Sequence, residues 1–115
     1  MLNEWTTEFS IISPGTLVRV VCDLWSDEPD NRIITLYETI HLETFPAWDD
    51  FFGKTTDVKC GQHALVLKTV GRPYRINPNV EIPLGGWGVD VYQILIDKDI
   101  RNILRCQIQE STNEH

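Results

Sequence analysis

Three residues that could act in metal binding or catalysis, Asp57, Cys60 and His63, follow one another at intervals of three. A thiolate and an imidazole are both good zinc ligands, and Cys-x2-His has the spacing of half of a zinc site. A structural zinc site needs four ligands. Cys22 and Cys106 could be the other two only if the apolar faces of their strands meet beside the turn that carries Cys60 and His63. We therefore expect no metal or other cofactor, and keep Cys60 and His63 as the candidate ligands.

The same residues also suggest a hydrolase with Cys60 as nucleophile, His63 as base and Asp57 as the orienting acid. Such a mechanism needs the thiol and the imidazole within hydrogen-bond reach, together with an oxyanion site. Neighbours in a turn rarely meet that geometry, so we interpret them as an incidental pair in an exposed turn. Adjacent carboxylates at Asp49 and Asp50 point in different directions and suit the start of a helical turn better than a cation site. We expect no catalytic residue.

Aromatic and arginine side chains, the types enriched at binding hot spots, gather in two long segments, residues 41–61 and 71–88. The glycine-rich segment 85–88 lacks the Lys-Ser/Thr that a phosphate loop requires. It instead carries one tryptophan, Trp87, in a flexible loop. The alternative is that the aromatics close the ends of the core, which we favour for Phe45 and Phe51. The candidate binding residues are Trp48, Phe51, Phe52, Arg72, Tyr74, Arg75 and Trp87, with Trp48 and Trp87 fitting both interpretations equally.

The composition limits the classes of partner. The chain has 115 residues, 10 Lys and Arg, 17 Asp and Glu, and a net charge of -7. Its acidity lies in residues 1–60, whereas residues 61–115 carry six charges of each sign. Duplex nucleic acids and anionic membranes attract clustered cations, so we expect neither as a partner. Three cysteines are too few and too irregular for a disulfide framework. No signal peptide and no span of about 18 apolar residues is evident, which predicts a cytoplasmic protein.

The chain is long enough for one domain, residues 1–115, with its own core. Apolar residues at helical spacing predict a short N-terminal helix or packing arm over residues 1–12. The tail, 110–115, is polar and expected to fray. Alternating or β-branched runs predict strands at 16–24, 32–39, 64–70, 89–96 and 100–109.

The strand alternation also predicts which side chains face the core. In the first strand these are Val18 and Val20, followed by Cys22 and Leu24. The last two strands form a hairpin through residues 97–99, with Tyr92, Ile94 and Ile96 on one face of the first. One face of the final strand is expected to carry Ile100, Asn102, Leu104, Cys106 and Ile108.

Five short strands and two long insertions predict a mainly β fold, a small five-stranded barrel or a rolled antiparallel sheet. The segments PGTLVRV, HALVLKTV and DVYQILIDKDIRNILRCQI resemble the strands of SH3-like barrels, particularly small uncharacterised ones from phages and mobile gene cassettes. The resemblance covers about half of the chain and departs from the family at the two insertions. It implies a domain that binds peptides or partner proteins, although no peptide groove can be carried over residue by residue.

The leading functional hypothesis is a non-enzymatic interaction module that self-associates, as a homodimer, or docks a partner protein. Its contacts would come from the aromatic loops or from an open sheet edge. The alternative is a small-molecule binder with a pocket between sheet and loops, lined by Trp48, Tyr74 and Trp87. A hydrolase using Cys60, His63 and Asp57 is the third hypothesis.

Overall fold

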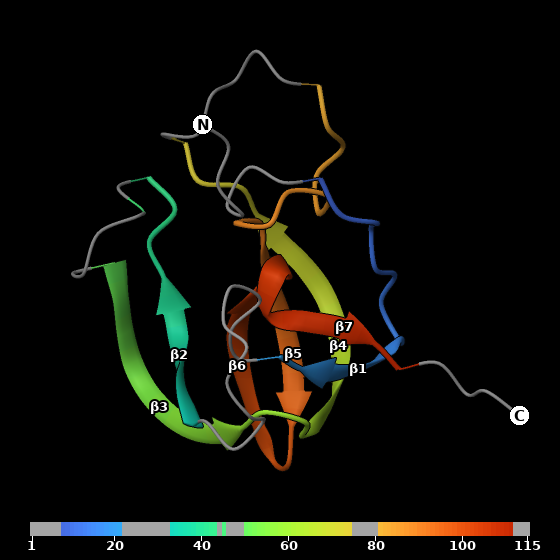
Figure 1. The fold of residues 1–115 in the computed structure, drawn as a ribbon. Coiled ribbons are helices and arrows are strands. Elements are labelled where there is room, and N and C mark those ends of the chain that lie inside the picture. Colours follow the sequence, from blue (N-terminus) through green and yellow to red (C-terminus); the bar gives the residue numbers. More distant parts are fainter. Residues whose placement is uncertain (1–7, 22–32, 44, 46–49, 75–80, 112–115) are drawn as a thin grey trace, which may run out of the picture.

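The chain is mainly β and forms one antiparallel sheet of seven strands in the order β3-β2-β6-β5-β4-β1-β7 (Figure 1). This computed structural model describes residues 8–21, 33–43, 45, 50–74 and 81–111. The 3-10 turn η3 (Arg105–Gln107) lies between the last two strands. The strands are β1 (Leu17–Val20), β2 (Ile33–Ile40), β3 (Phe51–Lys59), β4 (His63–Gly71), β5 (Val91–Ile96), β6 (Asp99–Leu104) and β7 (Ile108–Glu110).

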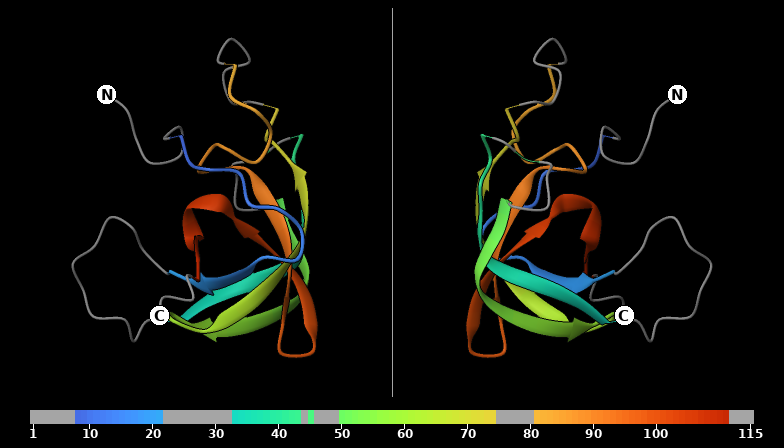
Figure 2. Two further views of the ribbon diagram at one scale, coloured as in Figure 1. Left: turned by 90° about the vertical axis from the view of Figure 1, so that its right-hand side faces the viewer. Right: turned by 90° about the vertical axis from the view of Figure 1, so that its left-hand side faces the viewer.

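The prediction of a closed five-stranded barrel is wrong, and the alternative of an antiparallel sheet is correct. The sheet curves strongly but stays open, because its two edge strands, β3 and β7, do not pair with each other (Figure 2). Two of the strands are not predicted by the sequence. β3 lies inside the segment 41–61, where the sequence pattern is ambiguous and suggests only a helical turn that starts at Asp49 and Asp50. β7 exists because η3 divides the predicted strand 100–109.

The predicted N-terminal helix is also wrong for the part of 1–12 that the structure describes. Residues 8–12 form no helix and behave as the packing arm that is the other prediction. Glu8 forms an isolated antiparallel bridge with Trp87, and the amide of Phe9 donates to the Gly86 carbonyl at 2.5 Å. A short helix is marginal on its own. This arm instead obtains its backbone partners from the loop around Gly86.

The inner face of the curved sheet carries the main hydrophobic core, as the alternation predicts. Val18 and Val20 of β1 and Tyr92, Ile94 and Ile96 of β5 are all fully buried, which confirms the assignment for these residues, whereas Cys22 and Leu24 lie outside the described residues. The cluster consists of Ile12, Val18, Val20, Leu36, Val58, Ala64, Val66, Tyr92, Ile94, Ile96, Ile103 and Ile108.

The hairpin of β5 and β6 is confirmed, and it turns over Asp97 and Lys98 with Ile96 opposite Asp99. Asp97 has a φ of 54°, which is the left-handed conformation that such two-residue turns require. The prediction of one common face in the last strand is correct for Ile100, Asn102 and Leu104 and wrong for Cys106 and Ile108. Ile103 lies opposite Tyr92 and joins the core, so Ile100, Asn102 and Leu104 lie on the outer face. η3 then interrupts the alternation of side chains between the two faces, so that Cys106 and Ile108 are buried.

A second hydrophobic cluster covers one end of the outer face. Its buried members are Ile40, Phe45, Trp87, Val89 and Val91, and Leu42, Phe51, Ile82 and Leu104 pack against them. The rings of Phe45 and Phe51 meet edge to face, with centroids 5.2 Å apart. Phe45 is 1% exposed and Phe51 is half-buried. These contacts support the interpretation of both phenylalanines as core residues.

The sheet has one weak join, between β2 and β6, where Tyr37 and Asn102 are the paired residues. Side chains bond to several of the neighbouring backbone groups instead. Asn102 Nδ2 donates to the Glu38 carbonyl at 2.8 Å, and the Leu104 amide donates to Gln107 Oε1 at 3.2 Å. A cavity of about 200 Å³ lies at this seam, between β2, β6 and η3.

The hydroxyl of Tyr92 ties the N-terminal arm and the glycine loop to the core. It accepts from the Ile12 amide at 3.1 Å and donates to the Gly85 carbonyl at 2.7 Å. We predict that Tyr92→Phe lowers the free energy of unfolding by about 1–3 kcal/mol, because it leaves two buried backbone groups without a partner. Tyr74→Phe, at a side chain that is 72% exposed, should change it by less than about 0.5 kcal/mol. Urea unfolding of both variants checks this, and equal midpoints would contradict it.

Candidate functional site

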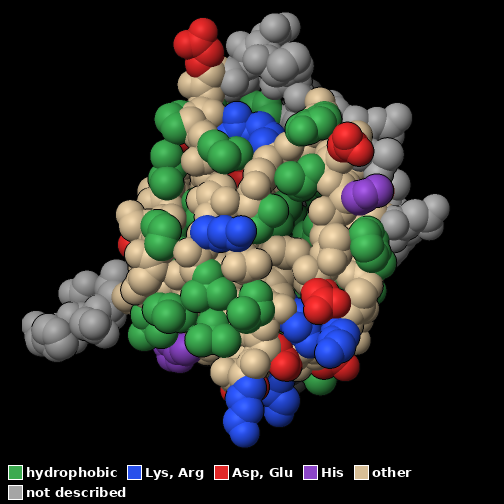
Figure 3. Space-filling model, turned by 180° about the vertical axis from the view of Figure 1, so that it is seen from behind, with side chains coloured by type: hydrophobic (Ala, Val, Ile, Leu, Met, Phe, Trp, Pro, Cys, Tyr) green, Lys and Arg blue, Asp and Glu red, His purple; other side chains and the backbone are tan. Residues whose placement is uncertain are grey.

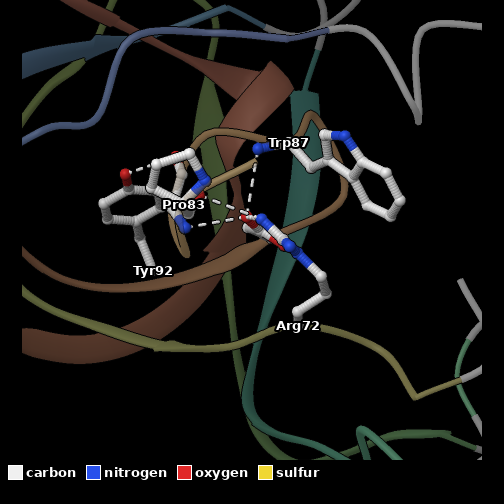
Figure 4. Close-up of polar contacts among 6 residues, drawn as sticks. Arg72, Pro83, Trp87 and Tyr92 are labelled. Atoms are coloured by element: carbon white, nitrogen blue, oxygen red, sulfur yellow. Dashed lines mark hydrogen bonds and ion pairs between the residues drawn. The ribbon is translucent and has the colours of Figure 1, made fainter. Parts of the chain in front are cut away.

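The predicted site residues Arg72 and Trp87 meet around a carboxylate that is not among the sequence-based candidates, Asp90 (Figure 4). Asp90 is fully buried, directly before β5. It accepts hydrogen bonds from Arg72 Nε at 2.8 Å and Arg72 Nη2 at 2.9 Å. It also accepts from the backbone amides of Gly85, at 2.8 Å, and Trp87, at 3.0 Å. One carboxylate therefore holds a cation and a loop together.

Arg72 is oriented by three kinds of contact. Its guanidinium forms a two-point ion pair with Asp90, donates to the Pro83 carbonyl at 3.0 Å, and lies 4.6 Å from the ring centre of Trp87. The hydrogen bond to Asp90 raises the pKa of Arg72 above its ordinary value, against the effect of burial. A paired guanidinium stacked on an aromatic ring is a stable arrangement that lysine could not reproduce.

This arrangement makes the glycine loop a structural element. Trp87 is 1% exposed, so its ring closes the outer core and is not presented to a partner. Gly85 has a φ of +99°, and a Cβ placed there would come within 2.6 Å of Tyr92 Oη. Only glycine suits that position. Of the two interpretations of Trp87 and its loop, the structure supports the structural one.

The other predicted binding residues do not join this cluster in one surface. Tyr74 is 72% exposed and Phe52 is 44% exposed, where its ring meets His41 edge to face at 5.6 Å. Phe51 is half-buried in the outer core. Trp48 and Arg75 lie outside the described residues.

The structure does not assemble Asp57, Cys60 and His63 into a site. Cys60 is disulfide-bonded, so it offers no thiolate to a metal or to a substrate. Asp57 accepts a hydrogen bond from Thr35 Oγ1 at 2.8 Å, and His63 lies exposed opposite Arg19. Within the described ranges, no group of three or more His, Cys, Asp or Glu side chains could hold a metal ion.

A row of four aliphatic side chains crosses the outer face, and the sequence alone does not reveal it. Leu17 of β1 is opposite Leu65 of β4, Leu65 is opposite Leu95 of β5, and Leu95 is opposite Ile100 of β6. Leu17 is 44% exposed and Ile100 is 48% exposed, and the other two are half-buried. Figure 3 shows apolar side chains gathered on this side of the molecule. We call these four residues the outer row.

Basic side chains flank the outer row on both sides. On one side of the row, two residues beyond Leu17 in β1, Arg19 lies opposite His63. On the other side, Lys68 of β4 lies opposite Gln93 of β5. Arg19, His63 and Lys68 are all exposed. The adjacent turn adds Lys98 and one acid, Asp97, which accepts a hydrogen bond from Gln62. The rim is thus mainly basic, although the chain as a whole carries a net charge of -7.

Comparison with protein-family models, with curated proteins and with solved structures finds no match to this chain. The resemblance to small SH3-like barrels therefore stays a prediction. Within the part of the chain that the structure describes, no helix is long and apolar enough to cross a membrane.

The buried carboxylate gives the second prediction. Asp90→Asn should lower the free energy of unfolding by about 3 kcal/mol, because the neutral amide breaks a buried ion pair and cannot accept from all four donors. Asp97→Asn is the matched control. It changes an exposed acid at a left-handed turn position that asparagine also favours, and should cost less than about 0.5 kcal/mol. Urea denaturation followed by circular dichroism measures both, and a loss below about 1 kcal/mol for Asp90→Asn would refute the structural role.

Proposed function

We propose that this chain is a non-enzymatic protein-interaction module, and that its outer row docks a partner protein that presents apolar side chains beside acidic ones. The observation that carries the proposal is the register that aligns Leu17, Leu65, Leu95 and Ile100 across four neighbouring strands. Because strand pairing holds the four side chains, they form a preorganised surface. A partner would not have to order it on binding.

The outer row lies on the part of the outer face that the second cluster leaves uncovered. The inner face is filled by the main core, and the second cluster covers the outer face around Val91 and Leu104. The row lies four residues further along the same strands, at Leu95 and Ile100, where Ile100 is 48% exposed. Single exposed aliphatic residues are normal, but a contiguous apolar strip with a polar rim is typical of an interaction site.

The sequence predicts two possible partners for this surface, a second copy of the chain or a different protein. The charge of the rim favours the different protein. A second copy docked row against row would bring Arg19 and Lys68 of one subunit towards the same cations of the other. Like charges placed together at an interface disfavour the pairing. An acidic partner instead gains from both rims, and the field of the rim would steer its approach. The predicted homodimer therefore becomes an outcome of the test.

The small-molecule alternative is not favoured by the cavity at the seam. At about 200 Å³ it is smaller than the roughly 300–1,000 Å³ of common ligand pockets. Its lining includes Tyr37 and Phe51. The sequence predicts Tyr74 and Trp87 in the lining, and neither of them lines this cavity.

The predicted cytoplasmic location has an observation against it. Cys60 is disulfide-bonded, and disulfides persist mainly in oxidising compartments. The proposed docking surface does not depend on the compartment, because the outer row contains no cysteine.

The third prediction tests the surface and its charge together. Three short synthetic peptides share the same leucines and phenylalanines, with Glu, Ser or Lys between them, and are titrated into isotope-labelled protein by NMR. We expect the Glu peptide to bind tightest, to shift the amides of the outer row, and to weaken as salt rises. Leu95→Thr should weaken it by about tenfold or more, since burying one leucine contributes roughly 1.5–3 kcal/mol.

Ile33→Thr is the matched control, because Ile33 is 60% exposed on β2, outside the row. It should leave the affinity unchanged. Shifts that avoid the row, or equal losses from both substitutions, would overturn the docking surface. Native mass spectrometry distinguishes the other occupant: a dimer that Leu95→Thr dissociates and Ile33→Thr does not would assign the row to a second copy.

A further inference from the structure

A separate pocket lies where η3 and β7 meet the N-terminal arm. Its volume is about 390 Å³, within the range of small-molecule sites. It shares no residue with the outer row, so a ligand could bind in it whether or not the outer row docks a partner. The residues that line it are Phe9, Ser10, Arg105, Ile108, Gln109 and Glu110.

Arg105 is a buried cation in the wall of this pocket, with only 5% of its surface exposed. Its Nε donates to the Ser10 carbonyl at 2.8 Å, its Nη2 to Ser10 Oγ at 3.1 Å, and its Nη1 to the Ile108 carbonyl at 2.9 Å. All three acceptors are neutral. Burial lowers the pKa of Arg105 below its ordinary value, and the electrostatic effects of Tyr92, Glu110 and Cys106 only partly offset this.

A buried charge without a charged partner is costly to a fold, whereas an anion that reaches it recovers much of that cost. None of the carboxylates that the structure describes forms an ion pair with Arg105; the described arginine pairs are those of Arg72 and Arg101. A guanidinium has five N–H groups in one plane, and the three bonds to Ser10 and Ile108 leave one on each Nη. Two donors of this kind match the two oxygens of a carboxylate.

We propose that this pocket binds a carboxylate group carried by a partly apolar organic molecule. The apolar part is assigned to the walls formed by Phe9, whose ring centre lies 4.9 Å from Arg105 Cζ, and by Ile108. Glu110 lines the same pocket and repels anions, so a dianion such as phosphate is disfavoured relative to a monocarboxylate. The carboxylate can belong to a free small molecule or to the C-terminus of a peptide.

The test uses benzoate as the probe, titrated into the full chain by NMR and calorimetry. We expect benzoate to shift the amides of residues 105–110, and inorganic phosphate to bind more weakly. Glu110→Gln should tighten benzoate binding by about threefold to tenfold, because it removes a nearby negative charge. Glu81→Gln, at an exposed acid outside the pocket, should leave the affinity unchanged.

Arg105→Lys keeps the charge and removes the two-point fork, so it should weaken benzoate by about tenfold or more. If that variant fails to fold, the Glu110→Gln result still decides. No benzoate binding to either the unaltered chain or Glu110→Gln, or equal affinities in the two, would overturn the site. Phosphate binding as tightly as benzoate would overturn its carboxylate class. A short apolar peptide with a free C-terminus, compared with its amide, separates a peptide ligand from a free small acid.

Discussion

The buried carboxylate of Asp90 is the constraint on which the rest of the structure depends. It satisfies the amides of Gly85 and Trp87 and, through Arg72, neutralises its own charge at a position where water has no access. Because the loop is held at that point, Trp87 lies over the outer face and closes the second core. The second cluster covers only this end of the outer face. The uncovered remainder of the same face is the surface with the outer row, so the buried ion pair also determines which part of the sheet stays available.

The strands that alternate are predictable from the sequence, and the ones that do not alternate are missed. Val18 and Val20 or Tyr92 and Ile94 show the period of two that a half-buried strand imposes. β3 shows no such period, since most of its side chains are exposed, and its pairing with β2 specifies it instead. The break at η3 depends on backbone bonds, such as that of the Arg105 amide to the Asp90 carbonyl, which no local pattern announces.

For the candidate site, the sequence indicates the important residue types but not their roles. Arg72 and Trp87 do lie together, but their role is structural, because both donate hydrogen bonds to the buried Asp90 and neither is presented to a partner. One signal could have found this carboxylate: an acid between two valines, Val89 and Val91, at the start of a buried strand must have partners. The outer row has no equivalent signal. Its members come from four strands and are neighbours only once the register is known.

The seam between β2 and β6 means that the two parts of this sheet need not open together. Within the main sheet, β5 is paired along its whole length with β6. The β2–β3 hairpin joins that sheet through one residue pair, a bond from Asn102 to the Glu38 carbonyl, and the packing of Leu36 and Val58 in the main core. Sub-global opening follows the weakest join, so we expect the backbone pairing of the hairpin with β6 to open at a smaller free energy than the pairing of β5 with β6. The amide protons of β2 and β3 would exchange with solvent through that partial opening, whereas those of β5 would exchange only when the whole domain unfolds.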